Sequence, residues 1–332
     1  MTRLLIYEAT YERLRPRLEA ADPALEPVTL SADGRLALQD REVTAETAGA
    51  LAAWASSEAF LGPAARAFSV AMLKSPQLKW VQSAAAGFDH PIFRQLVDKG
   101  LTLTTSHGQS VGMADYVVAG VLDHFQGGPA RRAAQAQHEW RRLSFRELAD
   151  TSWLVFGFGA IGQGVGRRAR GFGAKVVGVR RDRAADPAAD EIVTLDAARA
   201  RLGEADVVVF CLPLDAKTRS LADAEFFAAM KPGSVFVNVG RGGLVDEAAL
   251  LAALDKGTPE HAVLDVFETE PLPPDSPFWT HPRVSLTAHS SGATNGQDGR
   301  NDELFLENLR RFAAGEALLN LARAEDVRAA HA

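Results

Sequence analysis

Short apolar runs alternate with longer helical patterns along most of this chain. Between residues 153 and 289, the apolar runs are rich in β-branched residues and are separated by segments long enough for a helix. Such runs are typical of parallel strands that helices cover on both faces. The runs are WLVFGFG, KVVGVR, DVVVFCLP, SVFVNVG, HAVLDVF and RVSLTAH. This part of the chain is therefore expected to form an α/β domain around a parallel sheet.

The first 104 residues carry a weaker form of the same alternation. Their strand-like runs lie at 3–6, 79–83 and 101–104, between Ala-rich helical patterns. Residues 111–127 have helical spacing and end in a pair of glycines, which predicts a helix that stops there. The polar stretch 130–142 is expected to be a solvated helix face, and residues 300–320 predict an amphipathic helix.

Composition narrows the class of protein. A chain of 332 residues exceeds one core of ordinary size, so two domains are expected. The net charge of −6 gives no reason to expect a nucleic-acid or membrane partner, and no apolar run approaches the length of a membrane span. Cys211 is the only cysteine, which excludes an intrachain disulfide and a thiolate metal cluster. These features fit a protein of the reducing cytoplasm.

A glycine motif follows the first apolar run of the middle region. Gly157, Gly159 and Gly162 form G-x-G-x-x-G after a strand and at the start of a helical segment. The first glycine permits the turn, the second lets the backbone approach a pyrophosphate, and the third allows close packing of helix on strand. A structural turn in a domain that binds nothing is the alternative, but the strand–turn–helix context favours dinucleotide binding.

Polar residues follow other apolar runs and suggest a reaction. Arg241, Glu270 and His289 each come after such a run, and the carboxyl ends of parallel strands share one edge of a sheet. An arginine can clamp a carboxylate at two points, and a histidine can exchange a proton near neutral pH. A carboxylate behind the histidine would orient its ring. These are the groups needed to handle a 2-oxo acid.

Each residue also has an ordinary structural explanation when it is taken alone. Arg241 and Glu270 could be surface charges, and His289 could be a helix cap or a satisfied core residue. Their joint occurrence at strand ends favours catalysis. For His107 the structural and functional explanations are evenly balanced, and Trp279 is more readily explained by packing. The Asp, Glu and His residues show no metal-ligand spacing, so no metal is expected.

Ordered motifs over most of the chain resemble one family. They are QSAAAGFDH, GFGAIG, CLPLDAKT, MKPGSVFVNVGRGGLVDEAAL, LDVFETEPLP and LTAH. The set resembles the D-isomer-specific 2-hydroxyacid dehydrogenases, which include phosphoglycerate dehydrogenase and glyoxylate/hydroxypyruvate reductase. The resemblance implies an α/β fold of two Rossmann-like domains with doubly wound parallel sheets and an active site in the cleft between them. The substrate domain would comprise residues 1–104 and 297–332, and the dinucleotide-binding domain residues 105–296.

The resemblance also implies roles for individual residues. Arg241 would bind substrate, Glu270 would support the histidine, and His289 would be the acid/base. The backbone around Ala86 and Gly87 would hold the substrate carboxylate. The implied cofactor-binding residues are Gly157, Gly159, Ala160, Ile161, Gly162, Arg180, Arg181, Leu212, Pro213, Thr218, Val239, Gly240 and Asp265.

The residues at the end of the strand that follows the glycine motif bear on the choice of cofactor. An acid that binds the ribose 2′-hydroxyl is expected about 20 residues after the motif, but Arg180 and Arg181 stand there. Arginine pairs with a 2′-phosphate, so NADP(H) is expected to be preferred, with NAD(H) as a possible cofactor. Arg183 would extend the cluster. The alternative is that Asp182 binds the ribose and leaves the arginines solvated.

Two classes of function remain open from the sequence. The favoured one is NAD(P)H-dependent reduction of a small 2-oxo acid, of the glyoxylate or hydroxypyruvate kind, to the D-2-hydroxy acid. The other is a cofactor-sensing binding protein of the corepressor kind on the same fold, because such proteins retain the same three residue types. The resemblance further implies a homodimer, with the apolar helix at 111–127 as the natural contact.

Overall fold

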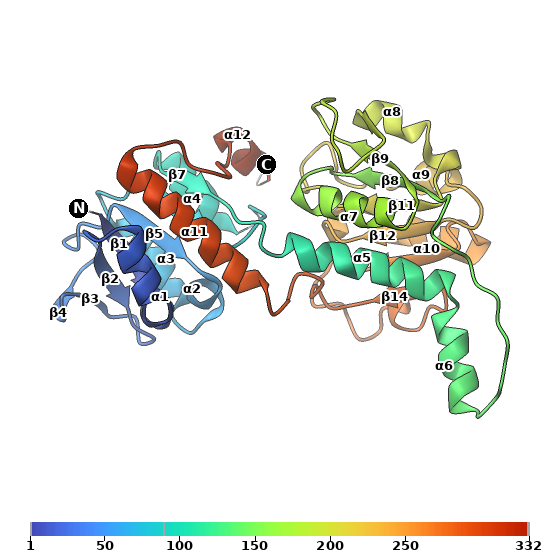
Figure 1. Ribbon diagram of the computed structural model, residues 1–332, viewed down its shortest axis with the longest axis horizontal. Helices are drawn as coiled ribbons and strands as arrows, with labels where there is room; N and C mark the ends of the chain where they lie inside the picture. Colours follow the sequence, from blue (N-terminus) through green and yellow to red (C-terminus); the bar gives the residue numbers. More distant parts are fainter. Residues whose placement is uncertain (1, 89, 331–332) are drawn as a thin grey trace. The chain divides into compact units, whose positions relative to one another are not determined.

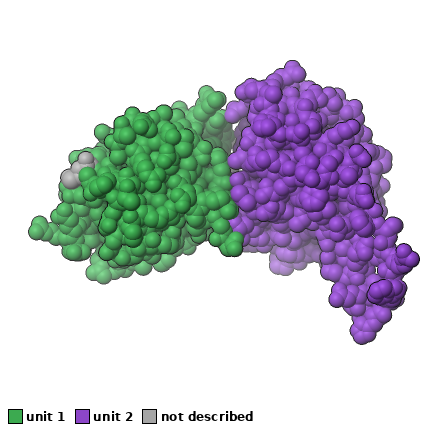
Figure 2. Space-filling model, in the orientation of Figure 1, with its two compact units in different colours: residues 1–108, 295–332 green, residues 109–294 purple. Residues whose placement is uncertain are grey.

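The computed structural model describes residues 2–88 and 90–330, and the chain divides into two compact units (Figures 1 and 2). Unit 1 contains residues 1–108 and 295–332, and unit 2 contains residues 109–294. Unit 1 is therefore built from both ends of the chain, and unit 2 from its middle. The substrate-binding and dinucleotide-binding roles expected for two such domains stay predictions.

Unit 1 contains a seven-stranded sheet in the order β4-β3-β2-β1-β5-β6-β7. The strands pair in parallel except for β2–β3 and β3–β4, which are antiparallel. Its strands are β1 (Arg3–Tyr7), β2 (Glu26–Leu30), β3 (Leu36–Leu38), β4 (Arg41–Val43), β5 (Ala52–Ala55), β6 (Trp80–Ser83) and β7 (Thr102–Thr104). Its helices are α1 (Glu8–Ala21), α2 (Ser57–Leu61), α3 (Ala65–Lys74), α4 (Pro91–Asp98), α11 (Gln297–Ala314) and α12 (Ala324–Ala329).

Alternate residues of the strands in unit 1 face two separate cores. Leu4 and Ile6 of β1 pack with Phe305 of α11, whereas Leu5 faces the cluster that contains Phe68 of α3. Side chains of a strand point alternately to the two faces of a sheet, so both faces are apolar and both need a covering helix. The segment after residue 294 supplies part of that cover, which explains why it belongs to unit 1.

Unit 2 contains a second seven-stranded sheet, and all of its strands pair in parallel. The strand order is β10-β9-β8-β11-β12-β13-β14. The strands are β8 (Ser152–Phe156), β9 (Lys175–Val179), β10 (Glu191–Val193), β11 (Val207–Phe210), β12 (Val235–Asn238), β13 (His261–Leu264) and β14 (Val284–Leu286). The helices are α5 (Ser110–Phe125), α6 (Gly128–Ala136), α7 (Ala160–Gly171), α8 (Leu195–Arg199), α9 (Ala224–Ala228) and α10 (Glu247–Lys256), with 3-10 turns η1 (Leu202–Glu204), η2 (Gly242–Leu244) and η3 (Pro277–Trp279).

The strand order of unit 2 creates a switch point between β8 and β11. The chain moves from β8 outward through β9 to β10, then returns to the other side of β8 and continues outward from β11. The helices that follow β8 and β11 therefore leave in opposite directions, and a ligand crevice is expected at the carboxyl ends of these two strands. The α/β class with two parallel-dominated, doubly wound sheets is confirmed.

Helix α5 is the element expected to form a dimer contact. Its apolar residues Met113, Val117 and Val121 are buried in the same core as Val165 of α7 and Val263 of β13. Much of the apolar face of α5 is therefore used inside unit 2, and the prediction that this helix forms a dimer contact stays a prediction.

Other element boundaries also differ from the sequence predictions. The helix predicted to stop at the two glycines ends at Phe125, but a second helix, α6, begins at Gly128. Figure 1 shows α6 running away from the body of unit 2. The helix predicted over 300–320 ends earlier, because Gly315 adopts a left-handed φ of +71° after α11. In the described ranges, none of the helices has the length and apolar character required to cross a membrane.

Candidate active site

The turn between β8 and α7 can be made only by glycine at its first position. Gly157 has a φ of +88°, and a Cβ atom there would lie 2.6 Å from the carbonyl oxygen of Cys211. The amides of Gly157 and Phe158 both donate to the carbonyl oxygen of Val179, each at 3.0 Å. These bonds hold the turn beside the end of β9, the strand that leads into the arginine cluster.

The space in front of α7 suits the pyrophosphate of a dinucleotide. A Cβ atom on Gly159 would meet nothing within 4 Å, and no side chain caps the N-terminus of the helix. Ala160, Ile161 and Gly162 form the first turn, whose amides lack partners within the helix. Such amides and the helix dipole favour a bound phosphate. The residues present therefore fit a nicotinamide dinucleotide.

The next strand ends lie close to the glycine turn. A Cβ atom on Gly157 would approach the amide nitrogen of Leu212 to 2.8 Å, and one on Gly240 would approach the carbonyl oxygen of Leu212 to 2.8 Å. Thr218 folds back on this segment, since its hydroxyl donates to the carbonyl oxygen of Pro213 at 2.9 Å. The predicted cofactor residues that lie here are Leu212, Pro213, Thr218, Val239 and Gly240, and their contacts with a cofactor stay predictions.

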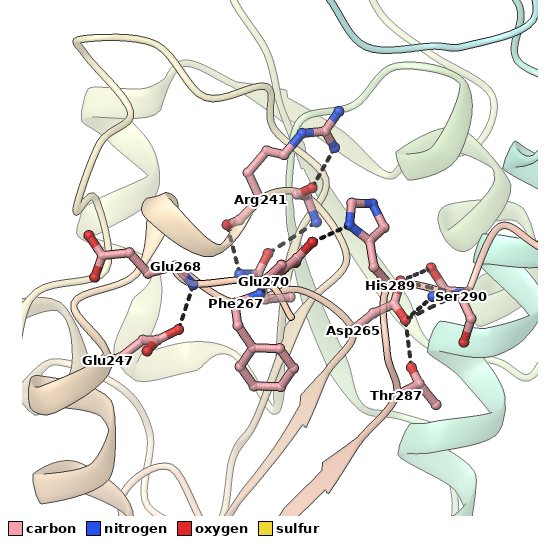
Figure 3. A network of polar contacts seen from close by, with 12 residues as sticks. Arg241, Glu247, Asp265, Phe267, Glu268, Glu270, Thr287, His289 and Ser290 are labelled. Atoms are coloured by element: carbon pink, nitrogen blue, oxygen red, sulfur yellow. Dashed lines mark hydrogen bonds and ion pairs between the residues drawn. The ribbon is translucent and has the colours of Figure 1, made fainter. Parts of the chain in front are cut away.

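His289 and Glu270 form a direct pair. Nδ1 of His289 lies 2.7 Å from Oε2 of Glu270, and the other carboxylate oxygen accepts the amide of Phe267 at 2.9 Å. Figure 3 shows the Glu270 side chain directed at the imidazole ring. Both side chains are partly open, with 50% of His289 and 35% of Glu270 exposed. Because Nδ1 is engaged, Nε2 is the nitrogen that can face a substrate.

Asp265 holds the loop that carries His289. Its carboxylate is fully buried and accepts the hydroxyls of Thr287 and Ser291, each at 2.5 Å, and the amides of Ser290 and Ser291 at 2.8 and 3.1 Å. The amide of His289 also donates to the carbonyl oxygen of Asp265 at 2.8 Å. His289 has a φ of +48°, a conformation that is uncommon for a residue with a side chain and that these contacts hold in place. The sequence predicted Asp265 as a cofactor ligand, which stays a prediction, and did not predict this support of the loop.

Arg241 is brought to the loop of Glu270 by a close backbone contact. A Cβ atom on Gly242 would lie 1.8 Å from the carbonyl carbon of Phe267, so no other residue could occupy this position without moving the loop. Asn238 braces the turn, because its side chain donates to the carbonyl oxygen of Arg241 and accepts the amide of Gly240, both at 3.0 Å. Figure 3 shows Arg241 on the same side of the site as Glu270 and His289.

Asn238 and Glu247 support the candidate site, and the sequence analysis assigned them no role. Glu247 accepts the amide of Glu268 at 2.7 Å and so fixes the loop before Glu270 (Figure 3). Burial raises the pKa of Glu247, and the neighbouring charges of Glu268 and Glu270 act in the same direction. A polar residue at the end of an apolar strand was a usable signal for Asn238. No local pattern distinguished Glu247 from other acids at a helix start.

The members of the arginine cluster differ in how much of each side chain is exposed. The Arg180 side chain is folded into its own loop and is 22% exposed, whereas Arg181 and Arg183 are exposed residues. The Asp182 carboxylate accepts the amide of Ala184 at 3.0 Å, so one of its oxygens shapes the turn. The other oxygen is not used in this contact, and the alternative in which Asp182 binds a ribose stays open.

The remaining candidates are placed individually. Ala86 and Gly87 lie in the loop after β6 of unit 1, and their approach to a substrate stays a prediction. His107 is exposed in the same unit. The Trp279 indole donates to the carbonyl oxygen of Pro273 at 2.8 Å, which supports its structural explanation. Burial raises the pKa of Cys211 to about 12, which disfavours a thiolate nucleophile there.

Comparison with known proteins settles the family. The model of the D-isomer specific 2-hydroxyacid dehydrogenase NAD-binding domain matches residues 118–291. The chain belongs to the D-isomer specific 2-hydroxyacid dehydrogenase family. The match covers the glycine turn, Arg241, Glu270 and His289, which are the residues whose geometry is described above. Within the residues that the structure describes, no group of three or more His, Cys, Asp or Glu side chains could hold a metal ion.

Individual family members show how far the similarity extends. This dehydrogenase-family chain is 35% identical over 274 residues to D-3-phosphoglycerate dehydrogenase of Mycobacterium bovis, covering 80% of this chain and 51% of that protein. It is 32% identical over 235 residues to glyoxylate/hydroxypyruvate reductase A of Salmonella heidelberg, covering 68% and 74% of the two chains. The chain thus spans about half the length of the phosphoglycerate dehydrogenases that it matches.

Similarity to a solved structure covers nearly the whole chain. The NADPH-dependent glyoxylate/hydroxypyruvate reductase of Sinorhizobium meliloti, solved in complex with NADP and sulfate, superposes with a TM-score of 0.76. The two sequences are 29% identical, and the match covers 98% of this chain and 100% of the other. The two-domain fold of this family member is therefore shared throughout.

Proposed function

We propose that this protein reduces a small 2-oxo acid, of the glyoxylate or hydroxypyruvate kind, to the D-2-hydroxy acid with NADPH. The observation that carries the proposal is the 2.7 Å contact between His289 and Glu270 in the unit that also contains the glycine turn. A carbonyl reduction requires an oriented acid/base and a bound nicotinamide, and unit 2 contains both the imidazole and the glycine turn. The similarity to glyoxylate/hydroxypyruvate reductases supports this substrate class.

The proton in this reaction comes from His289. When bound, the nicotinamide supplies the hydride for the carbonyl carbon. Glu270 holds Nδ1, so the opposite nitrogen, Nε2, delivers a proton to the carbonyl oxygen as negative charge develops there. The half-exposed ring then recovers a proton from solvent.

Arg241 orients the substrate in this proposal. Its guanidinium binds the carboxylate and the 2-oxo oxygen together, a two-point contact that a planar fork of N–H donors favours. The backbone around Ala86 and Gly87 supplies further donors to the carboxylate. Asn238 keeps the arginine turn in place through its contact with the carbonyl oxygen of Arg241.

The preference for NADPH rests on charge at the end of β9. Arg180, Arg181 and Arg183 lie directly after the strand whose last carbonyl is bonded to the glycine turn. A cationic group at this place favours a ribose 2′-phosphate over a hydroxyl. NADPH is named as the cofactor of the Sinorhizobium meliloti reductase, which is consistent with this reading.

A homodimer also belongs to the proposal, and the segment after α6 offers a contact surface for it. Trp140 is 99% exposed and Phe145 55% exposed in the segment after α6, where exposed aromatic groups favour association. We assign a second copy of the chain to this surface. The cytoplasmic location is retained as part of the same proposal.

The test is a panel of 2-oxo acids assayed with NADPH and with NADH by the absorbance of the reduced nicotinamide. Oxidation of NADPH with glyoxylate or hydroxypyruvate, at a higher kcat/KM than with NADH, is expected. Tight cofactor binding without turnover of any 2-oxo acid would instead favour a cofactor-sensing binding protein.

A further inference from the structure

The three arginines after β9 differ in their surroundings. Arg180 is largely covered, whereas Arg181 and Arg183 are exposed. All three follow Val179, whose carbonyl oxygen accepts both amides of the glycine turn. The cluster therefore begins beside the place expected for a pyrophosphate, but its members are not equivalent.

The Arg180 guanidinium is engaged within its own loop. Nε donates to the carbonyl oxygen of Asp182 at 2.8 Å, and Nη1 to the Asp186 carboxylate at 3.2 Å. Nη2 donates to the carbonyl oxygen of Ala184. All three nitrogens thus bind backbone or side chain of the segment 182–186, and binding a phosphate would require this arrangement to open.

Asp186 connects this arrangement to a fixed part of unit 2. Its carboxylate, 11% exposed, also accepts the amide of Ala188 at 2.9 Å. Ala188 is fully buried, and its carbonyl oxygen passes so close to α7 that a Cβ atom on Gly166 would lie 2.4 Å away. The Arg180–Asp186 pair therefore joins the end of β9 to a loop position that is packed on the helix.

Residues 180–186 carry more positive than negative charge. Arg180, Arg181 and Arg183 contribute +3 and Asp182 and Asp186 contribute −2, which leaves +1 for the segment. The charge of Arg180 is matched locally by Asp186. A dianionic phosphate approaching from solvent would meet the other two arginines first.

We propose that Arg180 is a positioning residue that holds the 181–187 loop, and that Arg181, with Arg183 beside it, contacts the 2′-phosphate of NADP(H). This inference deepens the proposed function and rests on its preference for NADPH. It leads to a specific expectation for a variant that lacks the Asp186 carboxylate. Removing that carboxylate must weaken NADPH binding, although it removes a negative charge from the neighbourhood of a phosphate.

The experiment measures Kd for NADPH and NADH with the full chain and the variants Arg181→Ala, Arg180→Ala and Asp186→Asn. Arg181→Ala is expected to weaken NADPH roughly 10- to 100-fold, because a charge-assisted bond to phosphate is lost, and to leave NADH within about 2-fold. Asp186→Asn is expected to weaken NADPH roughly 3- to 10-fold, because the loop loses its anchor. Asp196→Asn, an exposed carboxylate outside the loop, changes net charge equally and should change neither constant.

Tighter or unchanged NADPH binding in Asp186→Asn would overturn the proposal. Such a result would mean that the pair between Arg180 and Asp186 is not needed for NADPH binding. Normal NADPH binding in Arg181→Ala would overturn it as well. Amide hydrogen exchange gives a readout that does not depend on cofactor choice. Faster exchange over 181–187 in both Arg180→Ala and Asp186→Asn supports the positioning role, and unchanged exchange contradicts it. Equal wild-type Kd values for NADPH and NADH would contradict the proposed preference alone.

Discussion

At the scale of single residues, the proposed chemistry depends on how one imidazole ring is held. Glu270 uses one carboxylate oxygen for His289 and the other for the amide of Phe267. The second contact fixes the carboxylate itself, so the ring is oriented by a group that cannot turn freely. A carboxylate that was merely near the ring would not set the direction of Nε2.

Glu270→Gln tests this orientation. Gln keeps the size of the side chain and can still accept the amide of Phe267, but it cannot offer a carboxylate to Nδ1. The kcat for 2-oxo acid reduction is expected to fall roughly 10- to 1000-fold, with little change in the Kd for NADPH. Glu268→Gln, two residues earlier in the same loop, is the matched control and should keep near wild-type kcat. Equal losses in the two variants would mean that general loop charge, not the contact with His289, matters.

At the scale of elements, the loop after β14 is organised by a single buried carboxylate. Asp265, after β13, accepts hydrogen bonds from hydroxyl groups and backbone amides of residues 287–291. These contacts hold His289 in its left-handed conformation. The loop thus begins at the end of β14, and the carboxylate that binds it follows the adjacent parallel strand β13. The proposed acid/base, His289, is held by main-chain geometry as well as by Glu270.

Asp265→Asn is expected to loosen this loop. One carboxylate oxygen becomes an NH₂ group, which leaves buried donors of Ser290 or Ser291 without an acceptor and lowers the free energy of unfolding by about 1–3 kcal/mol. Urea unfolding measures the loss, and hydrogen exchange over 287–291 should rise. The exposed Asp275→Asn serves as the control. A higher Kd for NADPH with an unchanged loop would show that Asp265 acts on the cofactor instead.

A second feature at the scale of elements is a pair of stacked histidines at the amino end of β13, the end away from the candidate site. The rings of His124 and His261 are 4.4 Å apart and nearly parallel, and Nε2 of His261 lies 2.9 Å from the Ser285 hydroxyl. Burial lowers the pKa of His261 to about 4; His124 and His281 act in the same direction, and Asp123 opposes them. Burial also lowers the pKa of His124.

This stack predicts loss of stability in mild acid. The folded pKa of His261 lies below the ordinary value of 6.5, so the unfolded chain binds more protons between these values. Its contribution is therefore complete above pH 6.5 and is lost as the pH falls toward 4, by about 2 kcal/mol at pH 5. His261→Phe keeps an aromatic ring and removes the titration. Urea unfolding at both ends of this range should show a smaller pH dependence for the variant, and identical pH dependence would refute the assignment.

At the scale of the whole molecule, assembly is expected to depend on the segment after α6. Trp140→Glu places a charge at the most exposed aromatic side chain and should convert a two-chain mass to a one-chain mass in light scattering at micromolar concentration. Phe172→Glu alters another exposed aromatic residue, 51% exposed after α7, and should leave the mass unchanged. A wild-type protein with the mass of one chain would exclude this mode of assembly at that concentration.

Much of the fold of unit 2 could be predicted because its strands are strongly apolar and because the glycine motif stands between a strand and a helix. The strands of the first 104 residues were harder to recognise. β5 has the sequence AAWA, which favours a helix locally, and only its position between β1 and β6 makes it a strand. The sequence could not locate a dimer contact for a related reason. Periodicity shows that α5 has an apolar face but not that α7 and the sheet already cover it.

The positions of Arg241 and His289 near one another could be predicted because each follows the end of a strand. Contacts could not be predicted where a side chain has two suitable partners. Arg180 suits a phosphate and a carboxylate equally, and only the folded loop shows that Asp186 reaches it. Glu247 likewise gains its role from an amide 21 positions away along the chain.

The most direct test of the proposed reaction is the turnover of His289→Ala beside its binding of NADPH. Wild-type protein is expected to reduce glyoxylate or hydroxypyruvate, and the variant to lose about 10²- to 10⁴-fold in kcat while its Kd for NADPH stays within about 2-fold. His138→Ala, at an exposed histidine outside the site, should match the wild type. Near wild-type turnover in purified His289→Ala would contradict the assignment of His289 as the acid/base.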